Sequence, residues 1–412
     1  MRKLVSLMLV LVFMLTGCAP AQKEQRAKQD VLTMDWSEIQ RSAKGSQVRM
    51  FMWGGDQAVN RYIDQWVAPR LKEQYGVNLV RTPMNAPEFM QKLTTEKQAE
   101  LAQGTMDILW LNGENFKNAK ENQLLAPAFV QVLPNYQRYI DAAALDVQYD
   151  FGTPTEGLEA PWGKVQFVSL YDSAKVSNPP KSFAELAEWV KANPGKFTYP
   201  DPADFSGNAF LRHLMYEVVG KDKLVGKKFN AEDAETATKP MWEYLRQIKP
   251  YLWREGKTYP QDLTQLDQLF NQGEVWFSMG YNEARAEALI KQGTLPKSTK
   301  SFIMEPGSIG NTHFLTIPYN SPNRAGAMVA INFMLSPEAQ LAKMDSQWWG
   351  ENTVLDPSKL SSADQTKLTN LDRGVTVLPA AELKQAILPE VDPAYVEWIK
   401  EKWMREVVQA AN

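Results

Sequence analysis

Cysteine and histidine are almost absent from this sequence, which has one Cys and two His in 412 residues. A single Cys excludes a disulfide within the chain. His213 and His313 are isolated, and a zinc site built on them would have to rely on carboxylates, which is uncommon. The patterns of nucleophile elbows, zinc proteases, P-loops and dinucleotide-binding loops are also missing. Most catalytic classes are therefore disfavoured, although carboxylate-pair chemistry stays open because Asp and Glu are plentiful.

Neither sign of charge is in large excess. Lys plus Arg number 45 against 48 Asp plus Glu, a net charge of −3. This balance excludes a polybasic nucleic-acid binder and an acidic disordered chain. Apolar residues make up 44% and charged residues 23%, as in packed globular proteins. At about 150 residues per domain, the length indicates two or three domains.

The longest apolar run covers residues 4–15 and is too short to cross a bilayer. It follows the basic residues Arg2 and Lys3 and ends in the sequence LTGC, with Cys18 last. This pattern is typical of a bacterial lipoprotein signal peptide, cut before a Cys whose thiol carries diacylglycerol. An ordinary signal peptide with an incidental Cys is the alternative. We expect a signal peptide over 1–17, lipidation at Cys18 and a polar tether over 18–45.

Strand and helix patterns alternate along the body of the chain. In the first region this order predicts a parallel sheet with right-handed crossovers. The expected strands there are 48–53, 77–82 and 107–111, and the helices are 57–75 and 86–103. In the second region the expected strands are 164–171, 197–199 and 274–279, and the helices are 183–192, 209–219, 263–271 and 283–291. Strands 301–304 and 312–317 are expected to return to the first region, followed by helices 323–335 and 337–344 and a helical region with Pro breaks.

Four segments resemble a known family in the order in which that family carries them. They are GTMDI at 104–108 with NQLLAP at 122–127, PKSFAEL at 180–186, GEVWFSMG at 273–280 and NRAGAMVAINFMLSPEAQ at 323–340. The last match is long and specific, whereas each of the others is weak alone. Asn122 stands where the family usually has Gly. The chain resembles the bacterial extracellular solute-binding proteins of ABC importers, in a branch near the thiamine, polyamine and ferric-iron binders.

The resemblance implies an α/β fold of the two-lobed, type II periplasmic-binding-protein kind, which closes on its ligand by hinge motion. Lobe one would be 46–175 with 303–345, lobe two 176–302, and 346–412 a C-terminal helical region of unassigned lobe. The implied function is a monomeric substrate-binding lipoprotein on the periplasmic side of the cell envelope. It would deliver a small-molecule ligand to an ABC permease and its ATPase, without catalysis, cofactor, metal or nucleic acid. The alternatives are a periplasmic carboxylate-dependent hydrolase and a non-transport ligand sensor on the same fold.

Ligands of open α/β sheets bind beyond the carboxyl ends of the strands. The polar and glycine-rich loops at those positions are therefore the candidate site, although simple turns and helix caps explain many of the same residues. The candidates are Trp53, Gly54, Gly55 and Asp56; Asn112, Gly113, Glu114 and Asn115; Tyr171 and Asp172; Ser206, Gly207 and Asn208; and Tyr281, Asn282 and Glu283.

The candidate loops carry acidic and aromatic side chains without any Lys or Arg among them. The acids are Asp56, Glu114, Asp172 and Glu283, which favour a cationic organic solute through ion pairing and cation–π contact. The helix starts at Asp56 and at residues 206–208 argue the other way, because helix N-termini favour anions. A zwitterion or phosphorylated cation would satisfy both features, and a sugar stays open.

Overall fold

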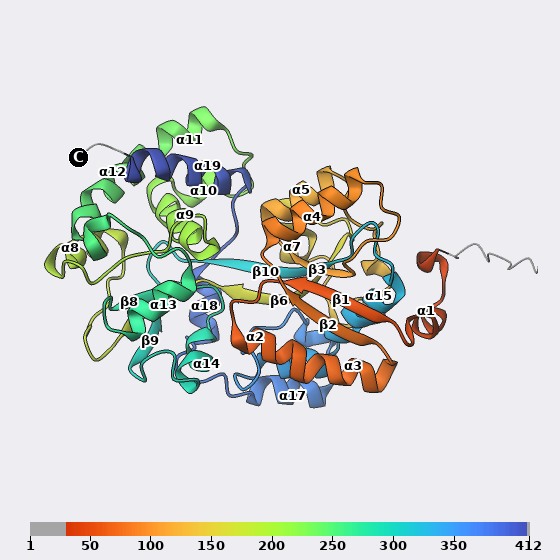
Figure 1. Cartoon of the computed structure of the whole chain (residues 1–412). Coiled ribbons are helices and arrows are strands. Elements are labelled where there is room, and N and C mark those ends of the chain that lie inside the picture. Colours follow the sequence, from red (N-terminus) through yellow and green to blue (C-terminus); the bar gives the residue numbers. More distant parts are fainter. Residues whose placement is uncertain (1–29, 410–412) are drawn as a thin grey trace, which may run out of the picture.

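The computed structural model describes residues 30–409. The predicted signal peptide, Cys18 and the first part of the tether lie outside these described residues. Two lobes are joined by the long strands β6 (Glu159–Gln166) and β10 (Ser308–Thr316), which run between them (Figure 1). Between residues 30 and 409, no helix combines the length and the apolar character that a membrane span requires.

The main sheet has six strands, in the order β11-β10-β3-β1-β2 with β6 paired to β10. Lobe one is built on this sheet apart from β11 (Ile387–Leu388), which pairs with Ser308 and Ile309 and packs in the core of lobe two. Strand β1 (Gln47–Met52) pairs in parallel with β2 (Asn78–Pro83) and β3 (Ile108–Leu111), which confirms the predicted parallel arrangement. Strand β10 is antiparallel to β3 and β6. The parallel strands have their carboxyl ends toward lobe two (Figure 1).

The helices of lobe one begin where short polar side chains accept the first free N–H groups. Asp35 forms a capping box with Glu38 at the start of α1, and Asp56 caps α2. The predicted helix 57–75 is present, with a π-helical middle just before Pro69. The predicted helix 86–103 ends at Gln98, because Glu100 takes a left-handed conformation that stops it. The elements are η1 (Val31–Thr33), α1 (Trp36–Ala43), α2 (Gln57–Arg61), η2 (Tyr62–Val67), α3 (Ala68–Tyr75), α4 (Ala86–Gln98), α5 (Gly113–Glu121), η3 (Val130–Val132), α6 (Pro134–Tyr139), α7 (Leu145–Gln148), α15 (Arg324–Met334) and α16 (Pro337–Met344). A small hairpin, β4 (Tyr149–Asp150) and β5 (Thr153–Pro154), follows α7.

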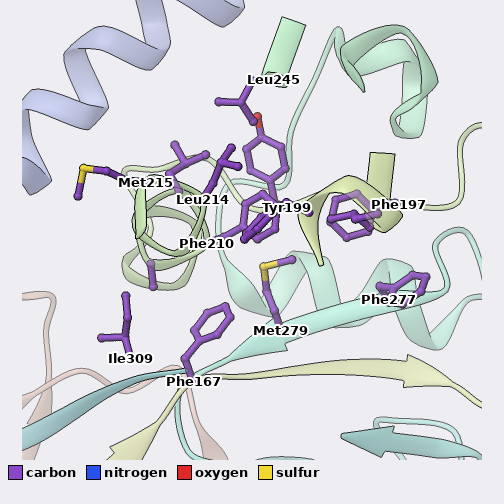
Figure 2. Packing of buried hydrophobic residues seen from close by; sticks show 14 of the residues in the cluster. Phe167, Phe197, Tyr199, Phe210, Leu214, Met215, Leu245, Phe277, Met279 and Ile309 are labelled. Carbon is purple, nitrogen blue, oxygen red and sulfur yellow. The ribbon is translucent and has the colours of Figure 1, made fainter. Parts of the chain in front are cut away.

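Lobe two has a three-stranded antiparallel sheet, β8-β7-β9. Its strands are β7 (Val168–Asp172), β8 (Phe277–Gly280) and β9 (Thr299–Phe302). Its helices are α8 (Phe183–Ala192), α9 (Phe205–Val219), α10 (Lys221–Leu224), α11 (Ala231–Ala237), α12 (Lys239–Ile248), η4 (Lys249–Tyr251), η5 (Trp253–Gly256), α13 (Leu263–Asn271) and α14 (Arg285–Lys291). The core is rich in aromatic side chains. Phe167 and Phe210 face each other and Met279 between α9 and the sheet (Figure 2).

Three expectations about strands in this half of the chain are wrong. The expected strand 164–171 is two strands, β6 and β7, which belong to different sheets and separate at Phe167. Residues 197–199 form no strand, although the Phe197 carbonyl accepts a hydrogen bond from the Trp253 N–H. The segment 301–304 does not return to lobe one, because β9 pairs with β7 in the small sheet. A local apolar pattern does not reveal which sheet a strand joins.

The C-terminal region is divided between the lobes. Residues 349–360, which include η6 (Pro357–Lys359), contribute Trp349, Val354 and Leu360 to the core of lobe one, and α17 (Ser362–Asn370) follows. The chain then crosses to lobe two, where α18 (Ala380–Ala386), β11 (Ile387–Leu388), α19 (Ala394–Trp403) and η7 (Met404–Val408) follow. The chain therefore passes between the lobes a third time, between α17 and α18 (Figure 1).

Candidate ligand cleft between the lobes

A cavity of about 340 Å³ lies where loops of the two lobes face each other. This volume is within the range of small-molecule sites. Lobe one lines it with Trp53, Gly54, Gly55, Pro83, Met84, Asn85 and Glu88, and lobe two with Asp204, Asp262, Leu263 and Thr264. Three of the predicted site residues are therefore brought to one cavity. The rest of its lining is the end of β2 and residues at the starts of α4, α9 and α13, which sequence reasoning did not select.

Trp53 is the main aromatic group of the cavity, with 40% of its surface exposed. The two glycines that follow it leave room for the indole ring and for the neighbouring strand. A Cβ at Gly55 would lie 2.4 Å from the indole, and one at Gly54 would lie 2.6 Å from the Cβ of Pro83. Any larger residue at either position would displace the ring or the neighbouring strand. The carboxylate of Asp56 caps α2, accepting from the Ala58 N–H at 2.7 Å.

Asp204 connects the two helix starts on the lobe two side. Its Oδ1 accepts from the N–H groups of Ser206 and Gly207 at 2.8 and 3.0 Å, and its Oδ2 accepts from the Leu263 N–H at 3.3 Å. Burial raises the pKa of the Asp204 carboxyl above its usual range. Helix α9 thus begins at Phe205, earlier than expected. The N–H groups of Ser206 and Gly207, which the sequence offered as anion donors, are bound to a carboxylate of the protein itself.

The predicted residues Ser206, Gly207 and Asn208 are buried within the first turn of α9. A Cβ at Gly207 would lie 2.3 Å from the carbonyl oxygen of Pro200, so close packing explains the glycine. The Asn208 amide donates to the Val396 carbonyl at 3.1 Å and joins α9 to the C-terminal helix. These contacts give each of the three residues a structural role in lobe two.

A charged and aromatic cluster lies one turn further along α9; sequence reasoning selected its Tyr281 but missed Arg212 and Glu390. Arg212 is fully buried and forms an ion pair with Glu390 from the C-terminal region. The Tyr281 hydroxyl donates to Glu390 at 2.8 Å. Burial raises the pKa of Glu390 to about 7, against the lowering effect of Arg212. Arg212 could have been suspected because it stands four residues after Asn208 on one helix face, but nothing local connects Glu390 to it.

The loop after β3 also meets lobe two. Glu114 pairs with Lys400 of α19 at 3.2 Å, and burial raises the pKa of Glu114. The Gly113 N–H donates to Asp150 at 2.6 Å, and the Asn112 amide donates to the Thr312 carbonyl at 2.6 Å. Asn115 is half-buried in the first turn of α5.

The segment after β8 lies at the hinge. Glu283 is buried and accepts from Arg373 at 2.9 Å and from the Gln166 N–H, at the end of β6, at 3.1 Å. Asn282 has a positive φ of 71° and accepts from the Ala284 N–H at 3.1 Å. The contacts of Glu283 therefore fasten the crossing strand.

Tyr171 and Asp172 are not brought together with the other candidates. Strand β7 is antiparallel to β8, with Val168 opposite Gly280 and Tyr171 opposite Phe277. Tyr171 and Asp172 consequently lie at the end of the small sheet opposite to the one that leads into Tyr281. Asp172 pairs there with Lys175 at 3.3 Å.

Comparison with known proteins agrees with this architecture. Residues 65–369 match the family model described as bacterial extracellular solute-binding protein. Protein YnjB of Escherichia coli (strain K12) is 39% identical over 372 residues, which cover 90% of this chain and 93% of that protein. The fold resembles that of the spermidine/putrescine transporter protein PotD from Streptococcus pneumoniae, with a TM-score of 0.61, 16% identity and coverage of 88% and 98% of the two chains. It also resembles a periplasmic thiamin binding protein, with a TM-score of 0.58, 17% identity and coverage of 89% and 96%. A third similar structure is AfuA of Actinobacillus pleuropneumoniae with fructose-6-phosphate bound, with a TM-score of 0.60, 14% identity and coverage of 89% and 99%.

The fold is thus that of two-lobed, type II periplasmic binding proteins, as predicted from the sequence. The chain belongs to the bacterial extracellular solute-binding protein family. Membership confirms capture of a small-molecule ligand for ABC transport, on the periplasmic side of the cell envelope, and disfavours the hydrolase and sensor alternatives.

Proposed function

We propose that this protein captures a small cationic organic solute in the cavity next to Trp53. One observation carries the proposal: the carboxylates of Glu88, Asp204 and Asp262 line that cavity together with the indole. Among the described residues that line it, none is Lys or Arg. A cation would gain charge-assisted hydrogen bonds from the carboxylates and about 0.5–2 kcal/mol from the indole face.

The acids that carry this proposal differ from the four that the sequence suggested. Glu114, Asp172 and Glu283 each have a cationic partner within the protein. Asp262 and Glu88 are the available acids of the cavity, because each has one oxygen engaged by a backbone N–H, that of Gln265 at 2.8 Å and that of Asn85 at 3.2 Å. Two of the similar structures bear names that include spermidine/putrescine and thiamin, which suit a cation, and one holds fructose-6-phosphate. Those names support the proposal only as precedents for the fold.

A ligand screen tests the class of solute. Putrescine, spermidine and thiamine are compared with glucose and fructose 6-phosphate by thermal shift, followed by calorimetry on any hit. A solute at 100 times its Kd should stabilise the protein by about 2.7 kcal/mol. Stabilisation by the sugar or the sugar phosphate alone would contradict the cation proposal. Recovery of the bound solute unchanged after prolonged incubation would support binding without turnover.

Asp262→Asn is a sharp test of the site. Asn is as good an N-cap as Asp, so α13 should keep its start while the cavity loses one negative charge. We expect the cation to bind about tenfold to a hundredfold more weakly by calorimetry, in line with the loss of a charge-assisted contact. Asp56→Asn is the matched control, because Asp56 also caps a helix but does not line the cavity. Equal weakening in the two variants would show that the effect is not local.

We also propose that Cys18 anchors the protein to the membrane through a lipid and that residues 1–17 are removed. The support is the basic, apolar and LTGC pattern of the sequence. Cys18→Ser should leave unprocessed precursor and abolish labelling with a fatty-acid probe. Cleavage and release of the Ser variant as usual would indicate an ordinary signal peptide.

For the mature protein we propose a monomer. Its lobe one covers residues 46–166 and 308–370, and its lobe two covers residues 168–306 and 380–409.

A further inference from the structure

The β4–β5 hairpin of lobe one carries an aromatic side chain into lobe two. Its turn is Phe151-Gly152, with φ of 46° and 73°. Both turn positions require positive φ, which Gly adopts freely and a bulky side chain rarely does. A Phe held in this conformation is an outlier that calls for a compensating contact.

The Phe151 ring finds its contacts across the cleft. It lies 6.0 Å from the ring of Phe205, and the Arg212 guanidinium carbon is 5.3 Å from its centroid. On its own lobe it packs against the backbone of Gly113, where a Cβ would come within 3.2 Å of the ring. Only 3% of Phe151 is exposed, although the residue forms the tip of a hairpin.

The base of the hairpin is fixed to lobe one. Asp150 accepts from the Gly113 N–H at 2.6 Å, so the hairpin is tied to the start of α5. Tyr149, on the same hairpin, is 43% exposed and takes no part in the aromatic contact with lobe two. The hairpin therefore has one side chain directed across the cleft and one directed to solvent.

We propose that Phe151 is a gate residue, whose ring joins the lobes and closes the α5–α9 end of the cleft. Opening of the lobes removes the ring from Phe205 and Arg212, exposes that side of it to water and leaves the strained turn without the contacts that lobe two supplies. The cost of exposing an aromatic ring opposes opening. The nearby ion pair between Glu114 and Lys400 acts in the same direction.

The distance between the lobes tests this gate directly. Spin labels at Asn118→Cys on α5 and Glu232→Cys on α11, both exposed positions, report it in a full chain with Cys18→Ser. We expect Phe151→Ala to add a population at longer distance, Phe151→Leu to give an intermediate result, and Tyr149→Ala to match the parent protein. Phe205→Ala removes the same contact from the other lobe without altering the hairpin, so it should lengthen the distance as well.

The outcomes separate a gate from ordinary packing. An unchanged distance distribution in both Phe151→Ala and Phe205→Ala overturns the proposal. The same lengthening in Tyr149→Ala also overturns it, because the hairpin as a whole would then be responsible. If Phe151→Ala does not fold, the distances in Phe205→Ala and Phe151→Leu decide between a gate and ordinary packing. The experiment needs no solute and is independent of the ligand class proposed above.

Discussion

Asp204 shows how one side chain can organise a binding surface. One of its oxygens fixes the first turn of α9 and the other fixes the start of α13, so the two helices of lobe two that border the cavity have a common anchor. Asp204→Asn keeps one oxygen that can accept a hydrogen bond and replaces the other oxygen with an NH2 group, which cannot accept one. Because both helix starts depend on this carboxylate, its replacement should alter the shape of the cavity, whereas Asp262→Asn alters mainly its charge.

His213 is a second residue whose contacts fix its chemical state. Its Nδ1 lies 2.7 Å from the Ala209 carbonyl oxygen and its Nε2 accepts from the Ile309 N–H at 2.9 Å, so the buried ring is neutral. Burial lowers the pKa of His213 to about 3. The unfolded chain binds a proton near pH 6.5 and the folded chain does not, so folding loses stability as the pH falls below 6.5.

We therefore predict a loss of about 1.4 kcal/mol per pH unit from His213 between pH 6.5 and pH 5. Urea unfolding at several pH values, with the parent protein and His213→Gln compared, isolates this contribution. The variant should be less stable at pH 7, because the amide replaces a ring that packs against Phe167, but the gap between the two proteins should shrink toward pH 5. A gap that stays constant with pH would contradict the assignment of a neutral ring.

At the scale of elements, helix α16 is held to the hinge strands by a buried charge. The ammonium of Lys343 lies 3.2 Å from Glu351 and 2.9 Å from the Asn352 carbonyl oxygen, and both charged side chains are almost fully buried. Burial lowers the pKa of Lys343 to about 8. The ion pair packs against Gly163 of β6, where a Cβ would collide with the Glu351 carboxylate.

Lys343→Met should destabilise the protein by about 3–5 kcal/mol, because it leaves the buried Glu351 without its ammonium partner and with only the His313 imidazole, at 2.9 Å, beside it. Chemical unfolding measures the loss. The double variant Lys343→Met, Glu351→Gln should recover part of it, since the orphaned charge is then removed. A double variant that is less stable than the single one would show that the ion pair is not the main role of these residues.

The elements that the sequence predicted correctly are those with local signals. Helix α13 was expected over its observed bounds, and in the structure Asp262 caps its first turn. The division of 164–171 between two sheets was missed, since it depends on β10 and β8, far along the chain. The same holds for the cleft. Trp53 and the two glycines follow a strand and could be found, whereas Arg212, Glu390 and Phe151 meet only in the folded molecule.

At the scale of the whole molecule, two lobes with separate cores, one cluster in lobe two and two in lobe one, are connected by three crossings. The third crossing is secured by Arg373, which donates to the Gly350 carbonyl at 2.9 Å and to Glu283 of lobe two at 2.9 Å. Further along, the Thr376 hydroxyl donates to Glu287 at 3.2 Å. These contacts span the hinge, so they restrict how far the lobes can separate. They lie on a segment that the family resemblance did not assign to either lobe.

We predict that Arg373→Ala widens the range of lobe positions, because Glu283 then keeps only the Gln166 N–H and the third crossing loses its attachment to Gly350. Small-angle scattering of the ligand-free protein should give a larger radius of gyration. Lys367→Ala is the matched control, since it removes a cation from exposed α17 that pairs only with Asp364 in its own helix. Its radius should equal that of the parent. Identical radii for all three proteins would mean that β6 and β10 alone set the hinge. Saturation with the solute should return Arg373→Ala to the parent radius, because a ligand held by both lobes replaces the missing connection.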